Sequence, residues 1–168
     1  MILRPLELKD EQEAVRGHHE LALENWEYLL TYEAGMEWNS YLDILEGHHL
    51  GKNLPTGRVP ATFLIADHEG DLIGRASIRH ELNDYLMNFG GHIGYGVRPA
   101  FRNRGFAGQI LAQSLKLINA MGVREVLITC TDENIASRKV IEAHGGILEN
   151  IVDQEGRTTR RYWITHQV

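Results

Sequence analysis

The residues best suited to chemistry lie between positions 97 and 107, where Arg98, Arg102 and Arg104 occur without any carboxylate and Gly105 follows. Hydrophobic spacing predicts that this segment joins a strand to the start of a long helix. The first turn of a helix leaves backbone N–H groups unpaired and carries partial positive charge, so it accepts phosphate oxygens. Glycine permits close approach of an anion, and arginines add charge-assisted contacts. The pattern predicts a pyrophosphate-binding turn, with an ordinary basic loop as the alternative.

The two commoner phosphate-binding motifs do not match the sequence. The P-loop string Gly-x-x-x-x-Gly-Lys-Ser/Thr does not occur. A Rossmann fingerprint placed on Gly94 and Gly96 meets Pro99-Ala100 where the next glycine is required, and no carboxylate ends a strand about 20 residues later.

Other residue types with chemical potential are few. His92 lies just before the turn, and its ordinary pKa near 6.5 makes it the leading candidate for a general base, with a purely local hydrogen bond as the alternative. Cys130 lies in a β-branched run, where a small core residue is expected rather than a nucleophile. The pairs His18-His19 and His48-His49 are adjacent residues that point apart, so no metal site is expected.

The hydrophobic pattern also predicts the elements that position these groups. Their order, β-α-α-β-β-β-α-β-α-β-β, predicts a mixed α/β sheet in one domain spanning residues 1–168. Glycines at positions 94 and 96 weaken one strand and predict a bulge or close approach of another group to the backbone. The predicted strands cover 2–8, 61–67, 72–80, 92–97, 126–131, 147–152 and 160–165. The predicted helices run from Asp10 through Leu30 to a break near Gly35, from Trp38 through Leu45, over 106–121, and from Asn134 to Ala143.

Composition excludes several classes of protein. The chain has 168 residues, 43% of them hydrophobic, and contains no apolar run of the ~20 residues that span a bilayer. A single cysteine excludes an internal disulfide, so we expect a cytoplasmic protein with no membrane partner. Residues 1–50 carry eleven acidic and three basic side chains. Since no extended basic face is predicted, nucleic acid is not an expected partner.

With these motifs in this order, the sequence resembles the GNAT superfamily of acyl-CoA-dependent N-acetyltransferases. The family's turn, Gln/Arg-x-x-Gly-x-Gly/Ala, is matched by residues 102–107, which follow a strand ending at 97–99. The family's Asn-x-x-Ala/Ser pattern is matched by residues 134–137. A poorly characterised branch of the family is also similar over residues 91–95 and 145–150.

The resemblance implies a fold, a cosubstrate and a set of binding residues. It implies an α/β (α+β) domain with a mixed, mostly antiparallel sheet, flanking helices and two splayed central strands, here 92–97 and 126–131. It implies acetyl-CoA as the cosubstrate, with no metal. The pyrophosphate would be held by the backbone amides of Arg102, Asn103, Arg104, Gly105, Phe106 and Ala107, and the pantetheine arm by main-chain groups near Val97 on one side and by Asn134 and Ser137 on the other.

The sequence departs from the family pattern at the usual proton donor. Many members carry a tyrosine seven residues after the asparagine, which protonates the leaving thiolate; this chain has Ile141 there, and Gly146 where phenylalanine is usual. Tyr95, Tyr85, Tyr162 or water would have to replace it.

The expected function is transfer of an acetyl group from acetyl-CoA to a primary amine of a small molecule or peptide by direct attack, with His92 as the base. The alternatives are a catalytically weakened CoA-binding module that acts through partner binding, and a phosphate-binding domain unrelated to acyl transfer. Many relatives pair through their sheets, so a homodimer is among the expected partners. Acidic residues toward the N-terminus would attract a cationic amine, and the alternative is that they form a solvated surface with no role in substrate binding. These residues are Glu24, Glu27, Glu33, Glu37 and Asp43.

Overall fold

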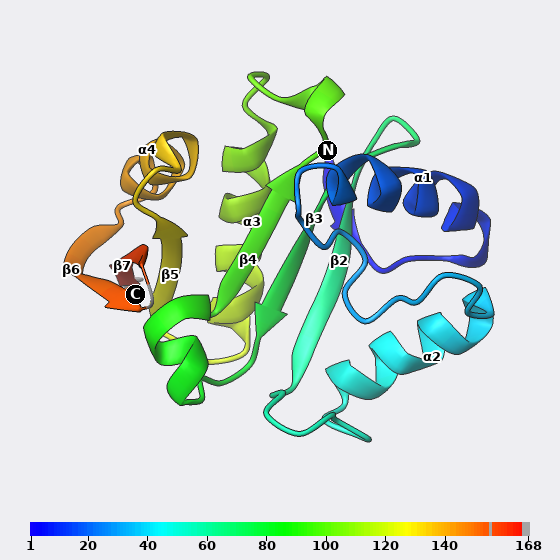
Figure 1. The fold of residues 1–168 in the computed structure, drawn as a ribbon, viewed down its shortest axis with the longest axis horizontal. Coiled ribbons are helices and arrows are strands. Elements are labelled where there is room, and N and C mark those ends of the chain that lie inside the picture. Colours follow the sequence, from blue (N-terminus) through cyan, green and yellow to red (C-terminus); the bar gives the residue numbers. More distant parts are fainter. Residues whose placement is uncertain (155, 166–168) are drawn as a thin grey trace.

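The computed structural model describes residues 1–154 and 156–165, which form two antiparallel sheets flanked by helices (Figure 1). The larger sheet has the order β1-β2-β3-β4 and the smaller the order β5-β7-β6. The strands are β1 (Ile2–Arg4), β2 (Ala61–His68), β3 (Asp71–Arg79), β4 (Ile93–Val97), β5 (Glu125–Thr131), β6 (Ile147–Gln154) and β7 (Arg157–Thr165).

Helices cover both faces of the larger sheet. The first face carries α1 (Glu11–Ala22) and α2 (Trp38–His49), which enclose a core containing Leu21, Tyr41 and Ile65. The opposite face carries α3 (Phe106–Ala120), and α4 (Ile135–Ala143) packs beside α3 and β5 (Figure 1). Side chains of α3 and α4 share a second core with both sheets, and this core joins the two halves of the molecule.

Strand β3 has a different character on each face because successive side chains of a strand point in opposite directions. Ala76 and Ile78 belong to the cores beneath α3. Arg75 pairs with Ile65 across the ladder, and Ile65 packs beneath α1 and α2, so the arginine lies on that face. The period of two places Arg79 there as well.

The expected order of strands and helices is confirmed, but several boundaries differ, among them two near the N-terminus. The first strand ends at Arg4, and the first helix ends at Ala22 instead of continuing through Leu30. Asn25 has a left-handed φ of 56°, and the amide of Trp26 donates to the carbonyl of Leu21 at 3.0 Å, which closes the helix. Trp26 and the buried residues after it have helical spacing, yet they pack against the sheet from a loop.

The predicted splay of the central strands is confirmed, and it divides the expected single sheet in two. Strands β4 and β5 form no ladder with each other. They meet at their base, where His92 donates its backbone N–H to the Leu127 carbonyl at 2.7 Å and accepts the Leu127 N–H on Nδ1 at 2.9 Å. Because an imidazole replaces a backbone carbonyl in this pairing, the two backbones diverge beyond it.

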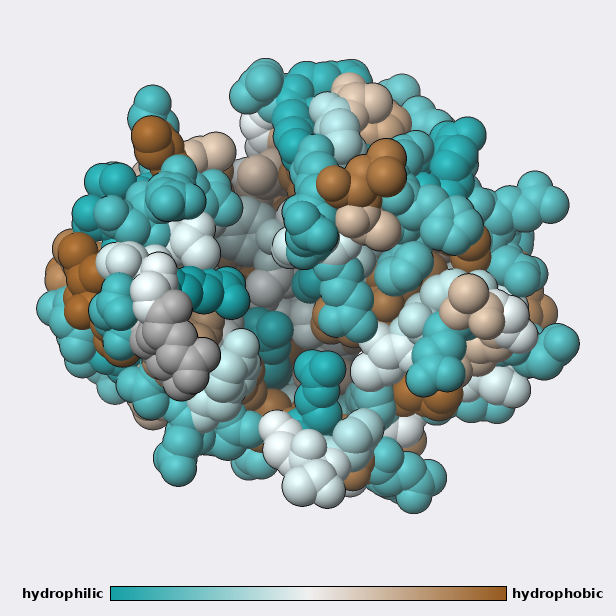
Figure 2. Space-filling view, in the orientation of Figure 1, coloured by the Kyte–Doolittle hydropathy of each residue, from teal (hydrophilic) through white to brown (hydrophobic). Residues whose placement is uncertain are grey.

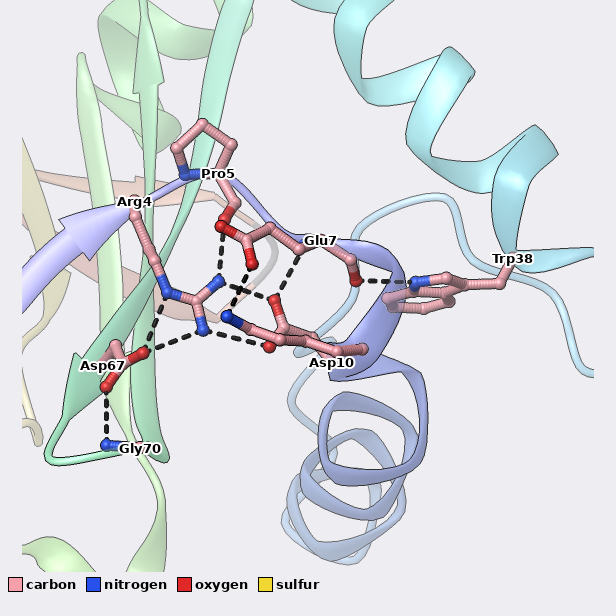
Figure 3. A network of polar contacts seen from close by, with 8 residues as sticks. Arg4, Pro5, Glu7, Asp10, Trp38, Asp67 and Gly70 are labelled. Carbon is pink, nitrogen blue, oxygen red and sulfur yellow. Dashed lines mark hydrogen bonds and ion pairs between the residues drawn. The ribbon is translucent and has the colours of Figure 1, made fainter.

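A polar network fixes the N-terminal segment against the sheet (Figure 3). The Arg4 guanidinium donates to Asp67 on β2 at 2.8 Å and to Asp10, at the start of α1, at 3.0 Å. Asp10 also accepts the Glu7 amide at 2.8 Å, and the Trp38 indole N–H, on α2, donates to the Glu7 carbonyl at 3.0 Å. The network therefore links β1, β2, α1 and α2.

Candidate active site

Two adjoining cavities occupy the gap between β4 and β5, where Figure 2 shows the surface hollowed. The smaller, of about 750 Å³, is lined by the turn before α3 and by the first residues of α4; we call it the turn cavity. The larger, of about 890 Å³, lies on the face covered by the segment between α1 and α2; we call it the inner cavity. Both cavities are lined by Glu24, Trp26, Tyr95, Asn134 and Ser137.

The turn before α3 presents free backbone donors to the turn cavity. The first hydrogen bond of the helix runs from the Gln109 amide to the Gly105 carbonyl at 3.3 Å, so the amides of Phe106 and Ala107 precede it, and no side chain caps the helix. Gly105 adopts φ of 78°, and a Cβ added there would meet nothing within 4 Å. The space in front of these amides is therefore open, which fits a diphosphate.

Arg98, the first arginine of the turn, has a structural role. It is 2% exposed, its guanidinium bonds Glu13 and Glu20 of α1, and it donates to the Leu72 carbonyl at 2.8 Å. It lines neither cavity. Its role is to attach α1 to the β3–β4 edge of the sheet.

The other two arginines differ in their partners. Arg102 donates from Nε to the Val97 carbonyl at 3.0 Å and pairs with the Glu24 carboxylate at 2.6 Å, a contact that lowers the Glu24 pKa. The Arg104 guanidinium lies 5.2 Å from the centre of the Phe106 ring and has no carboxylate partner among the described residues. Two of the three arginines of the turn are thus neutralised by glutamates: Arg98 by glutamates of α1, and Arg102 by Glu24 just after that helix.

A pair of hydroxyl groups crosses the gap where the cavities meet. Asn134 caps α4 by accepting the Ser137 amide at 3.0 Å, and the Ser137 hydroxyl lies 3.2 Å from the Tyr95 hydroxyl of β4. Burial raises the pKa of Tyr95 to about 12, although the hydrogen bond to Ser137 acts in the opposite direction. The phenol therefore remains protonated at neutral pH.

The remaining side chains considered as proton donors or nucleophiles are less well placed. Ile141 is fully buried in the core and lines neither cavity. Tyr162 is fully buried and donates to Glu142 at 3.0 Å, while Tyr85 is 62% exposed and lines only the inner cavity. Burial raises the pKa of the Cys130 thiol, which favours the protonated form and agrees with a core role.

His92 does not reach either cavity. It is 6% exposed, its Nδ1 is occupied by the Leu127 amide, and burial lowers its pKa to about 4. The geometry makes it the joint between the two sheets and argues against a role as the base.

Sequence reasoning missed the groups that line the inner cavity from β3. Two arginines four residues apart on one face of a largely apolar strand, Arg75 and Arg79, were the available signal. The expected close approach to the strand glycines is confirmed, and the approaching groups are side chains of this chain. A Cβ on Gly94 would lie 3.0 Å from Arg79 Nη1, and one on Gly96 would lie 2.5 Å from Trp26 Cη2.

The acidic side chains expected near an amine are mostly elsewhere. Glu24 and Glu27 line the inner cavity, whereas Glu33, Glu37 and Asp43 line neither cavity.

Within residues 1–154 and 156–165, no three or more His, Cys, Asp or Glu side chains gather as a metal site requires. No helix in this part of the chain combines the length and apolarity of a membrane span.

Comparison with solved structures finds the same fold in several acetyltransferases. RimJ of Mycobacterium smegmatis, solved with CoA-disulfide, is 21% identical with a TM-score of 0.70, over 97% of this chain and 80% of that one. A mutant of the spermidine N-acetyltransferase SpeG of Vibrio cholerae is 17% identical with a TM-score of 0.66, over 98% and 95%. The yncA protein of Salmonella typhimurium, solved with its cofactor acetyl-CoA, is 14% identical with a TM-score of 0.64, over 98% and 92%.

The family model for the acetyltransferase (GNAT) domain matches residues 1–147, and among curated proteins no relative matches. The chain therefore belongs to the GNAT family of acetyltransferases. The predicted resemblance is confirmed, and with it the expected cosubstrate, because GNAT acetyltransferases use acetyl-CoA.

Proposed function

We propose that the protein transfers an acetyl group from acetyl-CoA to a primary amine of a small molecule or peptide by direct attack. The observation that supports this most strongly is the meeting of the two cavities at Tyr95, Asn134 and Ser137. One cavity ends at free helix amides suited to a diphosphate. The other opens on the opposite side of the same gap and is large enough for a small-molecule acceptor.

The cosubstrate would lie along the turn cavity. Bound acetyl-CoA supplies the acetyl group as a thioester. Backbone amides of the turn receive its pyrophosphate, with Asn103 and Arg104 before Gly105 and with Phe106 and Ala107 after it. Arg102, whose own amide donates to the Pro99 carbonyl at 3.3 Å, contributes its side chain. The pantetheine arm runs between the main chain near Val97 and the start of α4, at Asn134 and Ser137; these residues line the cavity with the exception of Arg104.

Tyr95 is the proposed proton donor at the departing sulfur, in place of the tyrosine that Ile141 replaces. Its hydroxyl lies at the junction of the cavities, remains protonated at neutral pH, and is oriented by Ser137. After it gives up its proton, the phenolate regains one from solvent or from the newly formed product. The new bond joins the amine nitrogen to the acetyl carbon, and the bond that breaks joins that carbon to sulfur.

The first test measures CoA association by titration calorimetry in a matched pair of glycine variants. Gly105→Val and Gly122→Val place the same β-branched side chain at positive φ, 78° and 93°, where neither added Cβ has a neighbour within 4 Å. Position 105 faces the proposed pyrophosphate, and position 122 lies just beyond the other end of α3. We expect Gly105→Val to weaken CoA binding at least tenfold and Gly122→Val to leave it unchanged.

The second measurement is thiol release from acetyl-CoA with a panel of amines. Release with at least one amine is the expected result. Calorimetry that detects no CoA association, or association with no thiol release for any amine, would contradict the proposed function.

A further inference from the structure

The wall of the inner cavity is richer in cationic than in anionic side chains. Four arginines line it, and the carboxylates that line it are Glu24 and Glu27, the first of which already pairs with Arg102. Within the described residues, none of the four arginines forms an ion pair with a carboxylate. The four are Arg58, Arg75, Arg79 and Arg157.

Arg75 is a buried cation with only neutral partners. It is 4% exposed, donates to the Glu27 carbonyl at 2.8 Å and to the Gly94 carbonyl at 3.3 Å, and lies against the Trp26 ring at 4.1 Å. Its Nε has no hydrogen-bond partner. Burial lowers its pKa to about 9, and the nearby Arg79 adds to this. A buried charge is costly unless it is paired, so the site lacks an anion.

Arg79 repeats this situation four residues further along β3, on the same face. Its guanidinium donates to the Gly90 carbonyl at 3.1 Å. Burial lowers the pKa of Arg79 to about 10, and the positive charge of Arg58 contributes to this shift. It lies over Gly94, where any side chain would press on the guanidinium. The two arginines thus face the inner cavity with unneutralised charge.

The opposite wall contributes a second unused polar group. The Thr159 side chain on β7 is 2% exposed, lines the inner cavity, and its Oγ1 has no hydrogen-bond partner. A hydroxyl donor and guanidinium donors across one cavity are the groups that bind carboxylate and phosphoryl oxygens.

We propose that the acceptor is a small zwitterionic amine, one whose amino group is joined to a carboxylate or phosphonate that binds Arg75 and Arg79. This inference rests on the proposed function and replaces the expectation that acidic residues attract a cationic amine. The arginines would also help the chemistry, because neighbouring cations lower the pKa of a bound ammonium and increase its neutral, nucleophilic fraction. A free alkylamine is neutral in only about one molecule in a few thousand at pH 7.

The binding test uses the complex with CoA and two matched sets of probes. One set contains the free proteinogenic amino acids and 2-aminoethylphosphonate; the other contains the amino acid amides, which lack the anionic group, together with spermidine. We expect at least one free acid to bind in calorimetry at least tenfold more tightly than its amide, in line with the value of a charge-assisted hydrogen bond. Equal binding of acid and amide, preference for spermidine, or no binding of any anionic probe would overturn the proposal.

Variants then assign the effect to residues. Arg75→Gln and Arg79→Gln should each weaken binding of the preferred acid about tenfold or more, while its amide and CoA bind as before. Thr159→Val tests the opposite wall if an arginine variant fails to fold, and it should weaken binding of the acid alone. Arg124→Gln, an exposed arginine outside both cavities, is the control. Equal losses for acid and amide would overturn the assignment.

Thiol release separates this proposal from the proposed function. Acetylation of amines without preference for acids contradicts only the zwitterionic acceptor. Tight binding of acids without thiol release contradicts acetyl transfer and leaves the anion site standing.

Discussion

A single contact between hydroxyl groups, from Tyr95 of β4 to Ser137 of α4, spans the gap at the point where the two cavities meet. Strand β4 and helix α4 lie on opposite sides of the gap, and these two side chains join them. Because Ile141 is enclosed by the core, no polar group from that helical position reaches the gap. Proton transfer to the leaving group is therefore expected to depend on a residue from the strand.

At the scale of this residue, we predict that Tyr95→Phe lowers kcat about 100-fold, the usual contribution of a general acid, with little change in the KM for acetyl-CoA. The ring and its packing are retained, so only the proton is lost. Steady-state thiol release measures the effect. Tyr32→Phe, which removes a hydroxyl from a tyrosine that lines neither cavity, is the control and should retain full activity. Equal activity of the two variants would exclude Tyr95.

At the scale of elements, the turn before α3 and the segment after α1 are joined by the ion pair of Arg102 with Glu24. Glu24 lines both cavities, and Arg102 precedes the amides proposed for the pyrophosphate. For Arg102 to contact a phosphate, it has to share or leave its carboxylate partner. The acceptor side of the gap and the diphosphate side are thereby connected through one exposed contact.

We predict that Glu24→Gln tightens CoA binding, by up to about fivefold, because an exposed ion pair contributes little and its removal frees Arg102 for the phosphate. Calorimetry at low and high salt measures the change, which should shrink as salt increases. Glu33→Gln, an exposed glutamate in the same connecting segment, is the control. Weaker CoA binding by Glu24→Gln would show that the carboxylate supports the site instead of competing for it.

The order of elements was predictable because periodicity and turn residues are local signals. The end of α1 was not, since Trp26, Leu29 and Leu30 continue the helical spacing while their packing against the sheet is a tertiary effect. Similarly, the motif identified the turn, yet the neutralisation of Arg102 depends on a carboxylate 78 residues away in the chain. Arg75 was overlooked because nothing local distinguishes a buried arginine from one exposed at an edge.

At the scale of the whole molecule, the network around Arg4 and Asp10 contributes pH-dependent stability (Figure 3). Burial tends to raise the pKa of Asp10, but the hydrogen bonds from Arg4 and from the Glu7 amide outweigh it and lower the pKa overall. Since the unfolded value is about 3.9, this stabilisation is complete above that pH and is lost as the pH falls through the folded pKa.

We predict that Asp10→Asn lowers the free energy of unfolding by about 2 kcal/mol at pH 7, which corresponds to a fall in Tm of roughly 4–8 °C. The deficit should narrow as the solution is acidified toward pH 3, because the wild-type carboxyl then becomes protonated too. Thermal unfolding across this pH range provides the measurement. Asp43→Asn, at an exposed aspartate of α2, should behave like the wild type at every pH. A deficit that stays constant with pH would mean that packing, not charge, stabilises the network.

Because Gly94 and Gly96 have no side chains, other residues form the surface of β4 that faces the gap. Strand β4 borders the gap, but the side chains that cover its glycines come from other elements. These are the Arg79 guanidinium from β3 and the Trp26 indole from the segment after α1. A substitution of Arg79 or Trp26 would change the shape of the inner cavity, proposed here to hold the acceptor, without changing strand β4 itself. The proposed acceptor preference can therefore change through substitutions of side chains that cover β4, while the residues proposed to bind the thioester stay the same.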